Sequence, residues 1–251
     1  MFGLNKIIPV EPNINFLGLR KKFLIFSIVA IIISICLLTI KGLNLGIDFK
    51  GGTLIEISTK NTSIGELRDM LSESFNDVSL QEFGSKDKIL IRLQNKSNQE
   101  SIETVNEVKN LIQDKVLEFR RSEFVGPTIS SELLFRGFQA VSFALIAILI
   151  YIWLRFEWQF GFGAVVALTH DVLFTLGLLS VFNVEFSLAT IAAILTIAGY
   201  SINDTVVIFD RVRENLKKYS DIKIFDLTNI SINETLSRTI ITSVTTLLAL
   251  F

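Results

Sequence analysis

Long apolar runs are the feature of this sequence that most constrains its fold. Four of them, at residues 23–40, 137–154, 160–182 and 186–209, have roughly the 18–24 residues that an α-helix needs to cross a hydrocarbon core about 30 Å thick. The expected spans are residues 23–41, 131–154, 160–182 and 186–209. Only helices and closed barrels satisfy their backbone hydrogen bonds inside lipid, and these runs are too long for barrel strands. The sequence therefore predicts an α-helical multi-pass membrane protein, with the lipid bilayer as its surroundings.

A fifth apolar stretch occupies residues 236–251 and is still apolar at Phe251, where the sequence stops. It contains about a dozen consecutive apolar or small residues, which is too few for a complete crossing. We therefore expect residues 236–251 to be the start of a fifth span in a truncated chain.

The basic residues predict an orientation. They gather in residues 1–22 before the first span, recur at Arg155 after the second, and gather again in residues 210–235 after the fourth. Short basic loops stay in the cytoplasm. We therefore expect residues 1–22 and the loop 210–235 to be cytoplasmic, and residues 42–130 to lie outside. The net charge of −1 favours no partner by itself, and no nucleic-acid partner is expected.

The segment 42–130 changes in character and predicts a small domain between the first two spans. Strand-like stretches alternate with helical ones, in the order TLIEIS, ELRDMLSESF, DVSLQEF, KILIRL, an amphipathic helix at about residues 98–113, and FRRSEFV. The order β-α-β-β-α-β is that of a ferredoxin-like α+β domain. The segment has no histidine cluster, cysteine pair or phosphate-binding loop, so we expect a binding or mechanical role with no metal and no cofactor.

Glycine motifs mark both ends of this domain. The motif GIDFKGG, with Gly46, Asp48, Gly51 and Gly52, directly follows the first span, and Gly126-Pro127 ends the last expected strand. Paired glycines allow backbone conformations that are closed to other residues. One interpretation of GIDFKGG is a strand entry with a bulge. A nucleotide-binding loop is excluded because no strand-then-helix context surrounds the motif.

Ionisable residues interrupt the later apolar runs at His170, Asp171, Asp204 and Arg238, and Asn203 precedes the second carboxylate. A charge at mid-bilayer costs a few kcal/mol, so such groups face the bundle interior or a water path. Asp171 shares a helix face with small residues, which let a neighbouring helix approach, so we expect it to face another helix. His170 is expected to be a hydrogen-bonded packing residue.

The two remaining charges are expected at the same depth. Asp204 lies about 9 Å before Asp210 along its helix, and Arg238 about 6 Å beyond Glu234 on the returning helix. Because these two spans run antiparallel, an Asp204–Arg238 pair is geometrically plausible. Spacing alone leaves two interpretations open: a static ion pair, or a carboxylate whose protonation switches as the arginine moves.

Six motifs in fixed order carry a family resemblance: GIDFKGG, FVGPTISSELL, RFEW, ALTHDV, GYSINDTVVIFDRVREN and TLSRTIITSVTTL. Together they resemble the SecF branch of the SecD/SecF family of protein-export membrane subunits, within the resistance–nodulation–division superfamily. The resemblance covers nearly the whole chain from Gly42 onward. It implies six spans, so the chain would lack the end of the fifth and all of the sixth.

The resemblance also implies a function. Such proteins form a heteromeric complex with SecD and use the proton-motive force to drive or complete export of preproteins across the bacterial cytoplasmic (inner) membrane. The implied partners are SecD, the SecYEG channel, the ATPase SecA and YajC, and no enzymatic activity is expected. By motif, Asp204, Asn203 and Arg238 fall on the implied proton path, with Asp171 as a further candidate. We interpret GIDFKGG and Gly126-Pro127 as joints that couple the outer domain to the membrane.

Two other classes of membrane protein fit the sequence less well. A small-molecule or lipid exporter of the same superfamily usually carries much larger outer domains and twelve spans in one chain. A membrane enzyme would need a nucleophile–base pair, a metal cluster or a phosphate loop, none of which the sequence offers. Co-purification with a SecD-like partner would favour the export subunit, whereas drug accumulation on deletion would favour the exporter.

Overall fold

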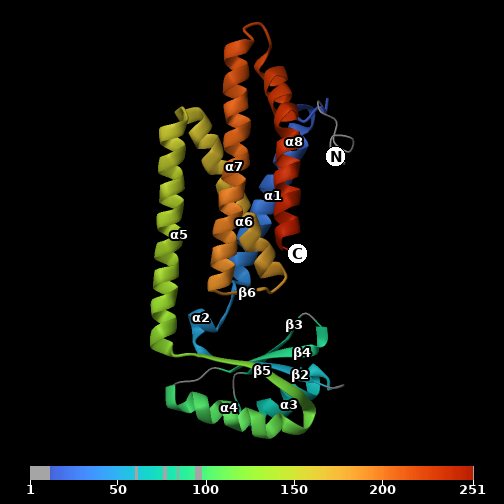
Figure 1. The fold of residues 1–251 in the computed structure, drawn as a ribbon, viewed down its shortest axis with the longest axis vertical. Helices are drawn as coiled ribbons and strands as arrows, with labels where there is room; N and C mark the ends of the chain where they lie inside the picture. The colour runs from blue at the N-terminus through green and yellow to red at the C-terminus, as the bar shows by residue number, and fades with distance from the viewer. Residues whose placement is uncertain (1–11, 60–61, 76–77, 84, 94–97, 251) are drawn as a thin grey trace. The chain divides into compact units, whose positions relative to one another are not determined.

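The structure is a computed structural model that describes residues 12–59, 62–75, 78–83, 85–93 and 98–250 (Figure 1). The chain divides into two compact units. One comprises residues 1–42, 145–182 and 193–251, and the other comprises residues 43–144 and 183–192.

Long helices make up most of the chain: α1 (Arg20–Ile40), which follows the short 3-10 helix η2 (Leu17–Leu19), α5 (Pro127–Arg155), α6 (Trp158–Val181), α7 (Leu188–Lys218) and α8 (Ile224–Leu250). Within the described ranges, α1 with η2, α5, α6 and α7 are long and apolar enough to cross a membrane, with mean hydropathy from 3.0 down to 1.6. The predicted α-helical multi-pass class is therefore confirmed. The connection expected at residues 210–235 is largely helical, because α7 runs on to Lys218 and α8 already begins at Ile224.

Close approach of backbones holds α1 against α6. Gly177 on α6 lies so near Ser34 on α1 that an added Cβ would overlap the serine side chain. Near the α5–α6 turn, the core residues Ile152, Phe156, Ala164 and Ile202 form an apolar cluster with Phe209 packed against it. The rings of Phe156 and Phe209 meet edge to face, with centroids 5.9 Å apart. Helices that are distant in sequence are thus joined by small and aromatic side chains.

The segment before α1 is fastened to α8 by backbone hydrogen bonds. Asn233 accepts from Ile14 N at 2.9 Å and donates to Ile14 O at 2.9 Å. Asn229, one turn earlier on α8, donates to the same carbonyl at 3.0 Å and accepts from Leu17 N at 3.2 Å. The two amide side chains therefore bind this segment through its backbone N–H and carbonyl groups only.

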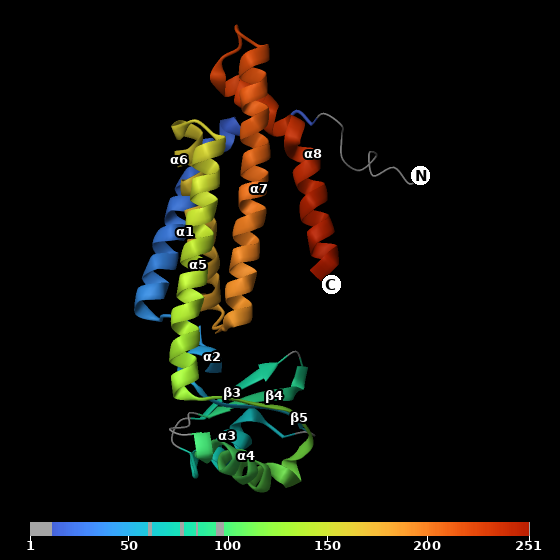
Figure 2. The same ribbon diagram turned by 60° about the vertical axis from the view of Figure 1, so that its left-hand side comes forward.

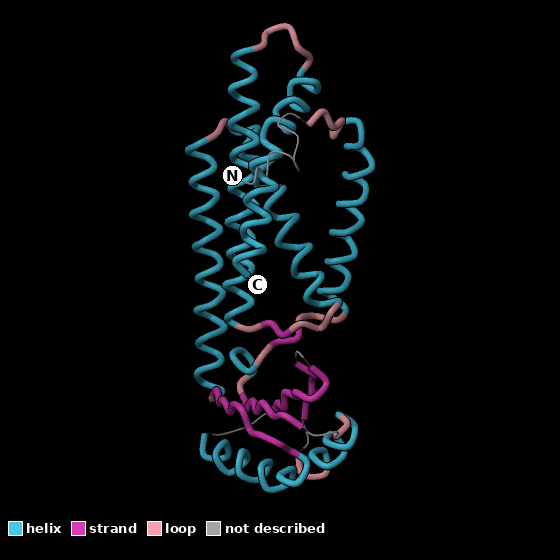
Figure 3. Tube along the Cα trace, turned by 45° about the vertical axis from the view of Figure 1, so that its right-hand side comes forward, coloured by secondary structure: helices cyan, strands magenta, loops and turns pink. Residues whose placement is uncertain are grey.

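The second unit contains a four-stranded antiparallel sheet of β2 (Gly52–Thr59), β3 (Val78–Phe83), β4 (Ser85–Leu93) and β5 (Val116–Val125), in the order β3-β4-β2-β5. Helices α3 (Ile64–Ser72) and α4 (Asn98–Ile112) cover one face of it (Figure 3). This is the predicted ferredoxin-like arrangement. Ser63 caps α3 by accepting from Glu66 N at 3.3 Å, and the core contains Ile55, Ile57, Leu67, Leu71, Ile89, Ile91, Val108 and Ile112.

A second, very small sheet was not expected from the sequence. Strand β1 (Asn44–Leu45) pairs in parallel with β6 (Glu185–Phe186), with Asn44 opposite Glu185. Asn44 Nδ2 also donates to Asn183 O at 3.2 Å, and Gly46 N donates to Phe186 O at 2.9 Å. The segment just before GIDFKGG is therefore hydrogen-bonded to the segment just before α7.

Candidate functional site

The motif GIDFKGG folds as one helical turn, α2 (Ile47–Lys50), followed by strand β2. Phe49 N and Lys50 N both donate to Gly46 O, at 3.1 and 3.0 Å, and Gly51 N donates to Ile47 O at 2.8 Å. The motif does enter a strand, since β2 begins at Gly52, but a helical turn closed by i→i+3 and i→i+4 hydrogen bonds stands there in place of the expected bulge. Gly51 and Gly52 have φ of +73° and +119°, which explains the glycine pair.

The two glycine motifs meet in this unit. A Cβ on Gly51 would lie 3.3 Å from Val125 O and 3.2 Å from Ser130 Oγ, so only glycine fits closely there. On the other side of that contact, Ser130 N donates to Gly126 O at 2.9 Å and Ser130 Oγ donates to Pro127 O at 3.0 Å. The sequence predicted both motifs as joints but did not predict that they touch each other.

Asp48 of GIDFKGG caps the start of α7. Its Oδ2 accepts from Leu188 N at 2.9 Å, and Leu188 is the first residue of that helix. A carboxylate at a helix N-terminus satisfies a free backbone N–H and stabilises the positive end of the helix dipole. Three residues upstream of this helix start, Glu185 forms an ion pair with Arg92 of β4. The motif is therefore bonded to the helix that further along carries Asp204.

Asp171 faces a neighbouring helix, as its small-residue surroundings predicted. Its Oδ2 accepts from Ser201 Oγ on α7 at 2.5 Å, and its Oδ1 lies 2.8 Å from His170 Nδ1. His170 is hydrogen-bonded in this way and also stacks on Phe174, with ring centroids 6.1 Å apart. The sequence did not single out Ser201, although it lies one helical turn from Asp204 within the same GYSIND stretch.

Asp204 and Arg238 are near enough to interact electrostatically without touching. The charge of Arg238 acts on the Asp204 carboxylate. Among the described residues, neither side chain makes a hydrogen bond or an ion pair within 4.0 Å. Asp204 is half-buried, whereas Arg238 and Asn203 are exposed. The expectation of similar depth is consistent with this placement, and the direct pair is not formed in this structure.

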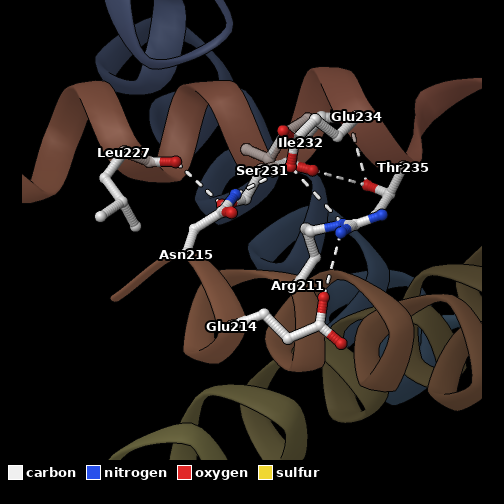
Figure 4. Close-up of polar contacts among 8 residues, drawn as sticks. All are labelled: Arg211, Glu214, Asn215, Leu227, Ser231, Ile232, Glu234 and Thr235. Atoms are coloured by element: carbon white, nitrogen blue, oxygen red, sulfur yellow. Dashed lines mark hydrogen bonds and ion pairs between the residues drawn. The ribbon is translucent and has the colours of Figure 1, made fainter. Parts of the chain in front are cut away.

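A polar cluster near the α7–α8 turn was missed by the sequence reasoning, which treated Arg211 as part of a basic flank (Figure 4). Asn215 is buried, and its Nδ2 donates to Ser231 Oγ at 3.0 Å and to Glu234 Oε2 at 2.8 Å. Arg211 Nε lies 3.5 Å from the same Glu234 oxygen. The sequence signal that could have indicated this cluster is a pair of polar residues at helical spacing on each helix, four apart on α7 and three apart on α8.

Metal binding has no support in the described part of the chain. No group of three or more His, Cys, Asp or Glu side chains there comes together to hold an ion.

Comparison with known proteins places this geometry in a family. The chain matches the family "Protein export membrane protein SecD/SecF, C-terminal" over residues 104–251, and "SecD/SecF GG Motif" over residues 37–63. The chain belongs to the SecD/SecF family. The first match covers the residues of α6, α7 and α8 described above, and the second covers GIDFKGG.

Curated relatives and solved structures agree with this membership. A protein translocase subunit SecF of Rickettsia bellii is 43% identical over 249 residues, covering 97% of this chain and 82% of that relative. A crystal structure of SecDF, a translocon-associated membrane protein from Thermus thermophilus, matches with a TM-score of 0.86 and 36% identity over 96% of this chain. SecDF in a super-membrane-facing form matches with a TM-score of 0.66 and 35% identity over 95% of the chain. The chain spans 33% of the length of each of these SecDF chains.

Proposed function

We propose that the chain is the SecF-type subunit of a bacterial preprotein translocase and acts with a SecD partner. In this role it uses the proton-motive force to drive or complete export of polypeptides across the cytoplasmic (inner) membrane, alongside the SecYEG channel, SecA and YajC. The N-terminus and the α7–α8 turn are cytoplasmic, and the sheet domain is periplasmic. Family membership and the basic flanks of the spans support this assignment.

The observation that carries the proposal is Asp204. It is a half-buried carboxylate inside an apolar helix, within electrostatic reach of Arg238 on the returning helix. A carboxylate inside a span is costly and marks an ion or proton pathway by default. The transmembrane potential supplies about 2.3 kcal/mol per charge per 100 mV, which is enough to bias a helix rearrangement. Ser201, one turn before Asp204 on α7, donates to Asp171 of α6 and extends the polar path, and Asn203 belongs to the same motif.

The glycine motifs supply a mechanical connection. Gly46, Gly51 and Gly52 shape a turn whose Asp48 holds the first residue of α7, and Gly126-Pro127 packs on the same turn. Because α7 is one continuous helix, a shift of Asp204 is transmitted to its capped end. The motif thereby couples the membrane charges to the domain that follows it.

The decisive experiment replaces Asp204 with Asn, which keeps the shape and hydrogen-bonding capacity but cannot ionise. The full-length chain is reconstituted with its SecD partner and the translocase, and export of a secretory protein is measured with and without a proton gradient. We expect Asp204→Asn to assemble normally and to lose the gradient-dependent part of export. Asp210→Asn, which removes a carboxylate further along α7 that is paired with Arg155 at the end of α5, is the matched control and should keep that part.

If Asp204→Asn retains gradient-dependent export, Asp204 is a structural residue. Asp171 or the SecD partner would then have to carry the proton.

A further inference from the structure

The facing sides of α7 and α8 carry a polar seam. On α7 its members are Asp204, Arg211 and Asn215, and on α8 they are Ser231, Glu234, Arg238 and Thr242. At about 100° per residue, each set falls within roughly 80° of its helix circumference. The contacts at the turn end of the seam show that the two sets face each other there (Figure 4). The helices are close at that end and spread apart away from it (Figure 2).

Arg238 stands between two carboxylates of this seam. Asp204 lies across the seam on α7, and Glu234 lies one turn earlier on α8 itself. Residues at i and i+4 are neighbours on a helix, about 5–6 Å apart at Cβ, and an acid preceding a base in this spacing is the favourable order. The Arg238 side chain makes no hydrogen bond or ion pair with the described residues, so its guanidinium is available to either acid.

Glu234 is placed to change partners. Both of its contacts, with Asn215 Nδ2 and with Arg211 Nε, use Oε2. Its Oε1 has no partner among the residues that the structure describes. Arg211 would keep its contact with Glu214 Oε2 at 3.0 Å, and Asn215 would keep its bond to Ser231 Oγ. Transfer of Glu234 therefore strands no charge, and it costs one hydrogen bond of the buried Asn215 amide.

The remaining charged groups near the seam are already paired. Asp210 contacts Arg155 at 2.6 Å and Arg213 at 3.7 Å, and Asp171 is bonded to His170 and Ser201. When the Asp204 carboxylate takes up a proton it becomes neutral, and its attraction for Arg238 is lost. Glu234 is then the remaining seam carboxylate within one turn of Arg238. When Asp204 releases that proton, its negative charge again competes for Arg238.

We propose that Glu234 is a positioning residue that holds Arg238 while Asp204 is protonated, and that its transfer from Arg211 to Arg238 loosens the turn end of the α7–α8 seam. This role rests on the proposed function, since it needs Asp204 to change protonation. In this proposal, the contact between Glu234 and Arg211 near the α7–α8 turn opens and closes once in each proton cycle. Arg211 and Asn215 hold Glu234 in the closed state.

The first test is Glu234→Gln in the full-length chain, reconstituted with its SecD partner. The glutamine keeps a hydrogen bond to Asn215 but cannot hold a cation. We expect gradient-dependent export to fall about tenfold, within the range of ordinary coupling effects, while export without a gradient is unchanged. Glu234→Asp, which keeps the charge on a shorter side chain, should restore part of the loss. The matched control is Asp226→Asn, which removes an exposed carboxylate from the first turn of α8, away from the seam face.

The second test locks the seam. Asn215→Cys and Ser231→Cys are combined in a Cys36→Ser background, because these side chains meet at 3.0 Å across the seam. Oxidation should stop the gradient-dependent export that the reduced pair shows, and a reductant should restore export to the level of the reduced pair. Wild-type export by Glu234→Gln, or undiminished gradient-dependent export by the oxidised pair, would overturn the positioning role.

Asp204→Asn, reconstituted in the same way, distinguishes failure of the proposed function from failure of the role of Glu234. If it loses gradient-dependent export while Glu234→Gln and the oxidised pair keep it, only the role of Glu234 is wrong. If Asp204→Asn keeps gradient-dependent export, the proposed function is wrong and the role of Glu234 is wrong with it.

Discussion

The sheet domain and the membrane helices place apolar side chains in opposite ways. In the sheet domain, Ile55, Ile57 and Leu67 are fully buried, so burial of apolar surface holds the strands and helices together. In the helical unit, Phe23 and Ile33 of α1 are more than half exposed, while Ser34 and Asn215 are buried. Lipid is as apolar as leucine, so helices in a membrane associate through close packing and polar contacts instead. A buried polar residue in the helical unit therefore marks a contact between helices.

The largest effect is expected when one isoleucine is truncated in the sheet domain and another in α1. Ile57→Ala removes buried methyl groups and leaves a cavity, so it should destabilise the sheet domain by about 2–5 kcal/mol. Ile33→Ala removes side-chain atoms that are exposed on α1 and should cost less than about 1 kcal/mol. Hydrogen–deuterium exchange of β2 and α1 peptides in the intact protein measures both changes. Equal acceleration in the two regions would contradict the comparison.

The next effect concerns close packing in the helical unit. Gly177→Val adds side-chain atoms where α6 meets Ser34 of α1, so the helices must separate. Overpacking of this kind costs about 1–3 kcal/mol. The melting temperature of the detergent-solubilised protein should fall accordingly. Gly199→Val is the control, because a Cβ there meets nothing within 4 Å. If both valines lower the melting temperature equally, the α1–α6 contact is not the cause.

The smallest effect concerns a single cap. Asp48→Ala removes the acceptor for Leu188 N at the start of α7, and loss of such a cap costs about 1 kcal/mol. Amide exchange in the first turn of α7 should quicken, whereas exchange of the sheet core should not change. Unchanged exchange at Leu188 would show that water replaces the carboxylate without loss.

Much of the fold could be predicted from the sequence because its signals are local. Uncharged runs set the spans, and alternation with capping signals set the βαββαβ domain. The paired strands β1 and β6 could not be predicted, since each has two residues and they come from distant segments. The helical extensions of α7 and α8 beyond the membrane were hidden by their polar composition.

Part of the candidate site was also predictable, because a charged residue in an apolar run is a local signal. The cost of a charge in lipid singled out Asp171, Asp204 and Arg238, and small neighbours indicated that Asp171 faces a helix. Its partner Ser201 and the buried Asn215 were missed, because a neutral polar residue costs less in a helix and so carries a weaker signal. Antiparallel spacing predicted equal depth for Asp204 and Arg238, but it could not predict that their side chains remain apart.

Because Asn229 and Asn233 bond only the backbone of Ile14, position 14 should tolerate substitution by most other amino acids. The amides bond the N–H and the carbonyl of residue 14, which nearly every amino acid presents identically. Exchanging the isoleucine for a polar or charged residue leaves this attachment intact. Proline is the exception, since it lacks the N–H donated to Asn233. Position 14 can therefore vary widely in chemistry while its backbone stays bonded to α8.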